Sequence, residues 1–210
     1  MGGSRLAGSG WVGGRGSTTL KAHASSQHAR RVLGIDPGTT VTGWGLVSSD
    51  GHALARVTSG QLRLRGERAT KLEAIFACVT ELCAEYRPDA VSLEQSFVGD
   101  NIQTALRLGE ARGAVMVASA RSGVAVYEYT PASIKMAVAG SGRADKVQMA
   151  AMVARLLGLP LELRSDEADA LGAAICHINT SRFDAQTAGA PAIGRRAGPP
   201  AGRARSSRWR

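Results

Sequence analysis

Two short apolar runs that lie far apart in the sequence both end on a carboxylate. Residues 32–35 lead directly to Asp36, and residues 90–93 lead directly to Glu94. Short apolar runs of this kind are typical of buried strands. A carboxylate at the end of such a strand is unfavourable to desolvate unless a cation lies beside it. The fold must therefore supply a cationic partner at the ends of two strands.

Two further acidic residues begin a helix near the end of the foldable sequence. Asp166 and Asp169 are three residues apart, so they lie on the same face of that helix, one turn apart. Small apolar residues surround Asp169 and allow a sheet to approach the helix closely. Four carboxylates from three separate elements can share one kind of partner, a divalent metal ion. The pattern therefore predicts metal-dependent chemistry.

Each of these acids, taken alone, also has a purely structural explanation. Asp36 precedes Pro37-Gly38, where aspartate commonly begins a turn. Glu94 is also compatible with an exposed position on an edge strand. Asp166 lies near a helix N-terminus, where the helix dipole stabilises aspartate. The metal-site hypothesis rests on the conjunction of the four acids rather than on any one of them.

The predicted elements follow the order three strands, helix, strand, helix, strand, helices. The first three strands, up to about residue 64, read as an antiparallel meander with a hairpin turn at Asp50-Gly51. The next two strands cover residues 90–93 and 124–129. Helical spacing and stop signals predict helices over 67–86, 100–120 and 145–157, a short helix carrying Lys135, and a last helix from Ser165 to about Asn179.

The positive charge is concentrated at the two ends of the chain. Of the formal net charge of +9, residues 1–31 carry five basic groups and no acid, and the last 30 residues carry seven arginines against Asp184. About −2 is left for residues 32–180. We expect residues 31–180 to form one folded domain, and the leader (1–30) and the Arg/Gly/Ala/Pro-rich tail (181–210) to be disordered. The tail arginines can attract phosphates without selecting a sequence.

Cysteine usage and the absence of apolar spans predict a soluble, cytoplasmic protein without membrane contact. Cys78, Cys83 and Cys176 form an odd set without close-paired metal spacing, which fits a reducing compartment. No apolar stretch is long enough to span a membrane, and residues 1–29 do not resemble a secretory signal. His177 follows Cys176, but adjacent residues on a helix diverge by about 100°. We therefore expect His177 to pack or cap rather than to bind a metal.

Four motifs place these acids in a known pattern. They occur in the order and at nearly the spacing found in RuvC Holliday-junction resolvases, and they span about residues 31–178. The chain resembles this family over nearly all of its foldable length, and only the long leader and the arginine tail depart from it. The motifs are Gly34-Ile35-Asp36-Pro37-Gly38, Leu93-Glu94-Gln95-Ser96-Phe97, Ala111-Arg112-Gly113 and Asp166-Glu167-Ala168-Asp169-Ala170-Leu171.

The resemblance implies an α/β, RNase H-like fold with a mixed five-stranded sheet and helices on both faces. It implies two Mg²⁺ ions per active site, with Mn²⁺ able to substitute. It also implies a homodimer that places two active sites against two strands of a four-way DNA junction, beside the RuvA-RuvB branch-migration complex. The implied catalytic residues, which are also the metal ligands, are Asp36, Glu94, Asp166 and Asp169.

The resemblance further implies a set of DNA contacts. Phe97 alone reads as a core residue, whereas the resemblance implies an exposed aromatic that stacks on an unpaired base near the crossover. Lys135 and Lys146 match positions where the family has basic residues near the scissile phosphate, although lysines ordinarily lie on solvated helix faces. Arg143, beside the loop at residues 140–142, is expected to follow the DNA backbone.

The predicted function is a Mg²⁺-dependent endodeoxyribonuclease that resolves Holliday junctions in recombination and repair by paired symmetrical nicks, leaving 5′-phosphate and 3′-hydroxyl ends. An actin-type kinase shares the pattern at residues 36–39, but it needs a second domain and a second phosphate loop that the sequence does not show. An RNase H-like nuclease acting on RNA precursors would have the same metal site and stays an alternative. A non-catalytic basic nucleic-acid binder would explain the tails and leave the four carboxylates unexplained.

Overall fold

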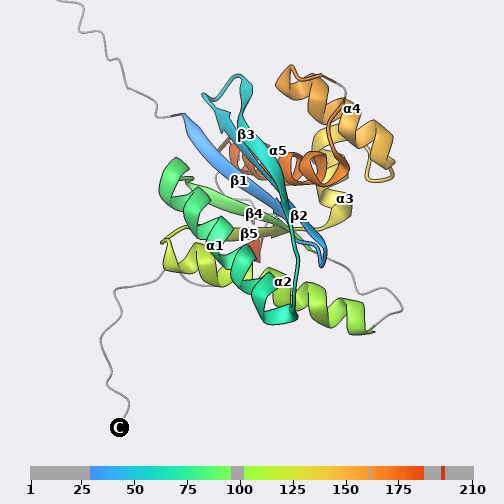
Figure 1. Cartoon of the computed structure of the whole chain (residues 1–210). Helices are drawn as coiled ribbons and strands as arrows, with labels where there is room; N and C mark the ends of the chain where they lie inside the picture. Colours follow the sequence, from blue (N-terminus) through green and yellow to red (C-terminus); the bar gives the residue numbers. More distant parts are fainter. Residues whose placement is uncertain (1–28, 96–101, 161, 187–194, 197–210) are drawn as a thin grey trace, which may run out of the picture.

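A computed structural model describes residues 29–95, 102–160, 162–186 and 195–196, and its centre is a mixed sheet (Figure 1). The strands are β1 (Arg30–Asp36), β2 (Val41–Ser49), β3 (Leu54–Arg63), β4 (Ala90–Glu94), β5 (Ala125–Tyr129) and β6 (Arg195–Arg196). Their order across the sheet is β3-β2-β1-β4-β5-β6. β1, β2 and β3 are antiparallel neighbours, whereas β4 runs parallel to both β1 and β5.

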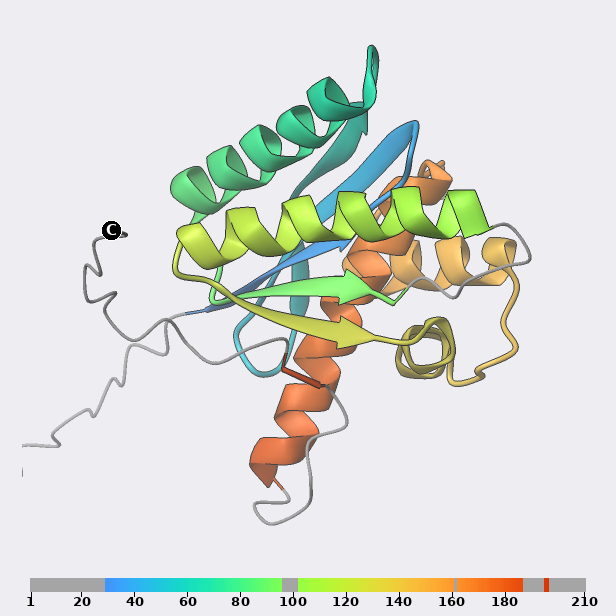
Figure 2. The same ribbon diagram turned by 90° about the horizontal axis from the view of Figure 1, so that it is seen from below.

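Helices cover both faces of this sheet (Figures 1 and 2). α1 (Arg68–Tyr86) and α2 (Ile102–Arg121) lie on one face, and α3 (Pro131–Ala139), α4 (Lys146–Leu157) and α5 (Ser165–Gln186) lie on the other. The predicted meander and the mixed five-stranded sheet between two helical layers are therefore confirmed. In addition, the two-residue strand β6, from the basic tail, pairs antiparallel with β5.

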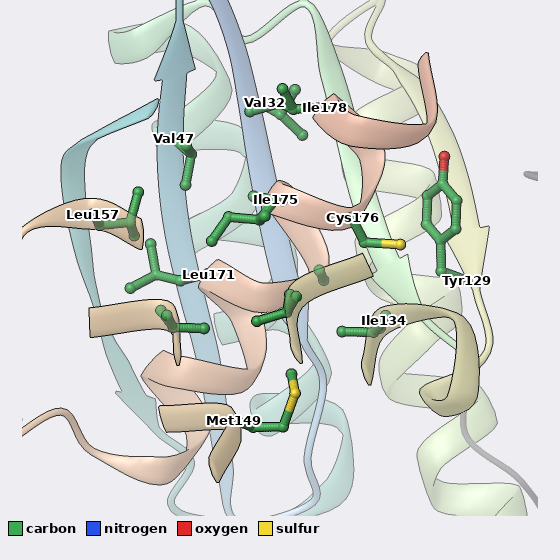
Figure 3. Packing of buried hydrophobic residues seen from close by; sticks show 14 of the residues in the cluster. Val32, Val47, Tyr129, Ile134, Met149, Leu157, Leu171, Ile175, Cys176 and Ile178 are labelled. Carbon is green, nitrogen blue, oxygen red and sulfur yellow. The ribbon is translucent and has the colours of Figure 1, made fainter. Parts of the chain in front are cut away.

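The core between the sheet and α3–α5 is centred on α5 (Figure 3). Every residue from 170 to 178 is buried, so this part of α5 is enclosed on all sides. Leu171 and Ile175 pack with Val32 and Val47 of the sheet in one apolar cluster, which α3 and α4 close from outside. Burying each such side chain contributes roughly 1.5–3 kcal/mol. The start of α5 is therefore held firmly against the sheet.

Glycines in β1 and β2 allow α5 to lie directly on the sheet. A Cβ at Gly34 would come 1.9 Å from the carbonyl oxygen of Ala170, and a Cβ at Gly43 would come 2.0 Å from that of Asp166. These separations are far below van der Waals contact, so neither position accepts a side chain unless α5 moves. Gly43 also pairs with Asp36 across the β1–β2 ladder. This packing therefore places the first turn of α5 beside the end of β1.

We expect Gly43→Ala to destabilise the protein by about 1–3 kcal/mol, because the added methyl group must displace the backbone of α5. The free energy of unfolding in urea measures this effect. Gly142→Ala is a matched control, since its Cβ would meet no atom closer than 3.6 Å. Equal stability of the two variants would show that α5 does not lie as close to β2 as described.

The last helix is longer than its sequence pattern indicated. We expected an end near Asn179, but α5 continues to Gln186, so that prediction was wrong. No glycine or proline interrupts residues 180–186, and tertiary contacts hold the additional turns. Arg30 Nη1 donates to Ser181 Oγ at 2.7 Å, and Arg182 donates to Ser49 Oγ. The arginine tail therefore begins after α5, not at residue 181.

Within the described residues, no helix combines the length and apolarity needed to cross a bilayer. The three cysteines are free thiols, with Cys83 and Cys176 buried and Cys78 half-buried. Burial raises the pKa of Cys176 to about 12, so its thiol is protonated and unreactive at neutral pH.

Candidate active site

Four carboxylates from three elements meet at the carboxyl ends of β1 and β4. Asp36 ends β1 and Glu94 ends β4, and these parallel strands are direct neighbours. Asp166 and Asp169 lie near the start of α5, which rests on the same end of the sheet. All four side chains belong to half-buried residues. The structure therefore brings together the four acids that the sequence had nominated.

Burial and mutual repulsion make this cluster poorly suited to carry four negative charges. Burial raises the pKa of Asp36 to about 7, and the charges of Glu94, Asp169 and Asp166 add to the shift. Burial likewise raises the pKa of Glu94, with a further contribution from Asp169. The pKa of Asp169 is raised by burial and, in smaller part, by Asp166. The ionised forms of these acids are therefore disfavoured unless cations compensate their charge.

Lys135 and Lys146 share a cavity with the carboxylates. The cavity has a volume of about 320 Å³, and Asp36, Glu94 and Asp169 line it together with the two lysines. The positive charge of Lys146 partly offsets the rise in the pKa of all three acids, and Lys135 does the same for Glu94 and Asp169. The two lysines can therefore attract a negatively charged ligand into this cavity, beside the carboxylates.

Caps at the starts of α3 and α4 determine where these lysines lie. Thr130 caps α3, because its Oγ1 accepts from the Ser133 N–H at 3.1 Å, and a proline follows in the first turn. Asp145 caps α4, because its Oδ1 accepts from the Gln148 N–H at 2.8 Å, while the Gln148 side chain accepts from the Asp145 N–H at 3.2 Å. The sequence therefore fixes locally the helix starts that carry both lysines toward the cavity.

The donor set suits a hard divalent cation, because it consists of carboxylate oxygens alone. Among the described residues, no group of three or more His, Cys, Asp or Glu side chains is arranged so that it could hold a metal ion. Mutually repelling carboxylates are expected to stay apart until a cation draws them together. Burial, and then the charges of the other three acids, raise the pKa of Asp36, and a bound cation would offset both effects. The residues therefore fit a metal by their chemistry, and the carboxylates would have to move closer together to hold it.

Asp166 differs from the other three acids in its surroundings. It is not among the residues that line the cavity, and its Oδ2 accepts from Gln61 Nε2 at 2.9 Å. Arg164 Nη1 in turn donates to Gln61 Oε1 at 3.3 Å. Asp166 therefore lies at the margin of the cluster, where β3 contacts it through Gln61.

The sequence analysis missed two residues that position the cluster. Gln61, which contacts Asp166, pairs with Gly43 across the β2–β3 ladder. Ser92, fully buried in β4, donates from Oγ to the Ala173 carbonyl oxygen of α5 at 2.7 Å. A serine inside an otherwise apolar strand was a usable signal, because a buried hydroxyl needs a partner. Gln61 carried no such signal until the strand register was known.

The remaining nominated residues lie outside the cavity or outside the described residues. Arg143 is exposed in the loop between α3 and α4 and does not line the cavity. Its backbone N–H donates to Ser141 Oγ at 3.3 Å, which orders the loop. Phe97 falls outside the described residues, so its stacking role stays a prediction.

His177 is an interior residue, as its sequence context predicted. It is 2% exposed, and its Nδ1 lies 2.8 Å from Tyr129 Oη. Arg30 Nη2 lies 3.4 Å from its Nε2. Burial, and then the charge of Arg30, lower the pKa of His177 to about 4, so the ring is neutral at pH 7. The expectation of a packing role is confirmed.

Comparison with known protein families assigns this arrangement to a group of relatives. The family model described as crossover junction endodeoxyribonuclease RuvC matches residues 32–177. The protein of that name from Halorhodospira halophila is 51% identical over 164 residues, which cover 76% of this chain and 98% of the relative. The one from Trichlorobacter lovleyi is 44% identical over 169 residues, covering 80% of this chain and 95% of the relative.

A solved structure shows the same similarity in three dimensions. The structure of T. thermophilus RuvC in complex with Holliday junction substrate matches with a TM-score of 0.70 and 35% sequence identity. The match covers 73% of this chain and 96% of that one. The segment matched by the family model contains all four carboxylates and both cavity lysines.

Proposed function

This chain belongs to the RuvC family of crossover junction endodeoxyribonucleases, and we propose that it resolves four-way DNA junctions in the cytoplasm by paired symmetrical nicks. The observation that carries the proposal is the half-buried carboxylate cluster facing two lysines at the carboxyl ends of β1 and β4. The acids are suited to a metal and the lysines to a phosphate, which are the two requirements of metal-assisted phosphodiester hydrolysis.

We assign the four carboxylates as the groups that would hold two Mg²⁺ ions, with Mn²⁺ able to take the same place. When bound, such ions lower the pKa of an attacking water and stabilise the leaving 3′ oxygen. Asp36 is the central ligand of this assignment, because the charges of all three other acids act on it. Gln61 orients Asp166 from the side of β3. The full ligand set is Asp36, Glu94, Asp166 and Asp169.

The lysines bind and orient the scissile phosphate in this proposal. Lys135 and Lys146 line the same cavity as Asp36, Glu94 and Asp169, so a phosphodiester bound there could place its negative oxygens on the lysines beside the acids. Cleavage of the bond between phosphorus and the 3′ oxygen leaves a 5′-phosphate and a 3′-hydroxyl. We assign Arg143 to the adjoining DNA backbone and Phe97 to an unpaired base at the crossover, both on the basis of family resemblance.

Paired nicks require two active sites related by a two-fold axis, and α2 offers a surface for such a dimer. Gly109 and Gly113 on α2 have open space where a Cβ would lie. Beside them, Ile102, Leu106 and Val117 are 72%, 60% and 54% exposed. Exposed apolar residues around small ones suit close helix packing between two copies of the chain. We therefore propose a homodimer in which α2 packs against its symmetry mate.

Gly109→Arg should convert the dimer to a monomer and abolish paired nicking. The helix itself should persist, because replacing a helical glycine favours helix formation by up to about 1 kcal/mol. Sedimentation equilibrium at micromolar concentration measures the change, and Ala84→Arg on the exposed face of α1 is the control for added charge. A wild-type protein that is monomeric under these conditions would remove the geometric basis of paired nicking.

On the basis of the family resemblance, we also propose the RuvA-RuvB branch-migration complex as a partner. The substrate is tested by incubating the protein and Mg²⁺ with a labelled four-way junction, a plain duplex and an RNA hairpin. We expect cleavage of the junction alone, at symmetrical positions in two strands of like polarity. Preferential cleavage of the hairpin would identify an RNA nuclease, and binding to all three without cleavage would identify a non-catalytic binder.

A further inference from the structure

A second cavity lies beside the turn that follows Asp36, on the side away from the cavity that holds the carboxylates. It has a volume of about 330 Å³ and is lined by the turn at residues 38–40 and by the first halves of α1 and α2. Its charged side chains include Arg68, Lys71 and Arg107. We refer to this cavity, formed by these three residues and the turn, as the basic pocket. The cavity that holds Asp36, Glu94 and Asp169, here called the catalytic cavity, is lined by residues of α3, α4 and α5. The two cavities therefore belong to opposite faces of the sheet.

The basic pocket has more positive charge than its own carboxylate neutralises. Glu110 is the acid that lines it, and its Oε2 lies 3.4 Å from Arg68 Nε. That pair is weak, because the Arg68 side chain is 72% exposed. Lys71 Nζ donates to the carbonyl oxygen of Thr39 at 3.3 Å, and no ion pair or hydrogen bond joins the Arg107 side chain to any described residue. Three cations against one acid leave a net charge of +2, which favours an anionic ligand.

The size and the floor of the basic pocket indicate a ligand larger than a phosphate ion. Leu64, Leu72 and Ile75 form an apolar floor beneath the charged rim. A volume near 330 Å³ is at the lower end of the range for small-molecule sites, roughly 300–1,000 Å³, which are likewise apolar with a few polar groups. Glu110 Oε2 is buried and accepts no hydrogen bond from a described residue, so it can accept one from an N–H group of a ligand. A nucleotide supplies each of these features: a phosphate, the apolar faces of its sugar and base, and N–H donors on the base edge.

The position of the basic pocket connects it to the catalytic cavity. Asp36 lines the catalytic cavity and Gly38 lines the basic pocket. Two residues of chain span at most about 7 Å, so one DNA strand that crosses this end of the sheet can reach both cavities. We propose that the basic pocket binds a nucleotide of the cleaved strand near the scissile phosphate, with its phosphate on Lys71, Arg68 and Arg107 and its base or sugar on the apolar floor. This inference rests on the proposed function.

The test measures binding of fluorescein-labelled tetrathymidylate to the full chain in a chelating buffer. Without metal the carboxylate cluster repels phosphate, so the affinity reports the basic side chains. We expect Lys71→Gln and Arg107→Gln each to weaken binding by roughly five- to tenfold and to reduce the slope of log Kd against log salt by about 0.7, as expected for one lost phosphate contact on a single strand. Lys71→Arg should retain wild-type affinity.

Arg121→Gln is the matched control, because Arg121 lies on the same helix about 21 Å from Arg107 and carries the same charge. Wild-type affinity and salt slope in both Lys71→Gln and Arg107→Gln would overturn the inference, and so would equal losses in Arg121→Gln. Arg107→Gln decides the matter if Lys71→Gln disturbs the turn, because Arg107 has no such contact to lose. Failure of the proposed function is separable: it would appear as intact junctions in Mg²⁺, whatever the affinity for tetrathymidylate.

Discussion

Asp36→Asn, Glu94→Gln and Asp169→Asn should each reduce cleavage of a four-way junction by about a thousandfold or more. Each change replaces a carboxylate oxygen by an amide group and removes one charge from the proposed metal site, while the shape of the side chain stays nearly the same. A loss of this size corresponds to about 4 kcal/mol of transition-state stabilisation, within the several kcal/mol that metal ions supply. Single-turnover cleavage at saturating protein measures the rate without interference from binding.

Junction binding by these variants should remain close to that of the wild type, because the three acids do not pair with phosphates. Glu167→Gln is a matched control: it lies one residue from Asp166 on the same helix, but contacts Ser59 and Arg56 of β3 instead of the cavity. We expect this control to cleave at a rate near that of the wild type. A variant at position 36, 94 or 169 that keeps near-normal cleavage would exclude that residue from the metal site.

The strands and the acids at their ends were predictable because each depends on local sequence. An apolar run that ends in aspartate or glutamate marks both a strand and the position of its last side chain, as for Asp36 and Glu94. The spacing of Asp166 and Asp169 likewise determined that they share a helix face. The convergence of these elements on one site, however, was predicted from the four acids together and from the resemblance to a family, not from any single pattern.

The contacts that position the cluster were not predictable, because they depend on how elements pack. Gln61 reaches Asp166 only because the β2–β3 register places it opposite Gly43. The additional turns of α5 have no helix signal of their own and are held by contacts such as Arg182 with Ser49. The basic pocket combines side chains from α1, α2 and the β1–β2 turn, which are distant in sequence. The Gln61 contact, the additional turns of α5 and the basic pocket all depend on tertiary packing.

Without metal, the wild-type protein should lose stability as pH rises from about 4 to about 7, and Asp36→Asn should lose less. The pKa of Asp36 is about 7 in the folded protein against an ordinary 3.8, so the folded state binds the proton more tightly than the unfolded chain does. Stability contributed by this proton is complete below pH 3.8, falls through the interval between the two values, and is absent above about 7. The whole difference corresponds to roughly 4 kcal/mol.

Urea unfolding in chelator at pH 4 and pH 8 measures this prediction for the wild type and Asp36→Asn. The variant should be the more stable protein at pH 8, because it removes a charge that is buried and that Glu94, Asp169 and Asp166 repel, and the advantage should shrink at pH 4. Adding Mg²⁺ at pH 8 should then stabilise the wild type much more than the variant, since a ligand stabilises only the state that binds it. If instead the chelated wild type is the more stable protein at pH 8, the Asp36 carboxylate is neither buried nor repelled as described, and a cation would have no unfavourable charge to compensate.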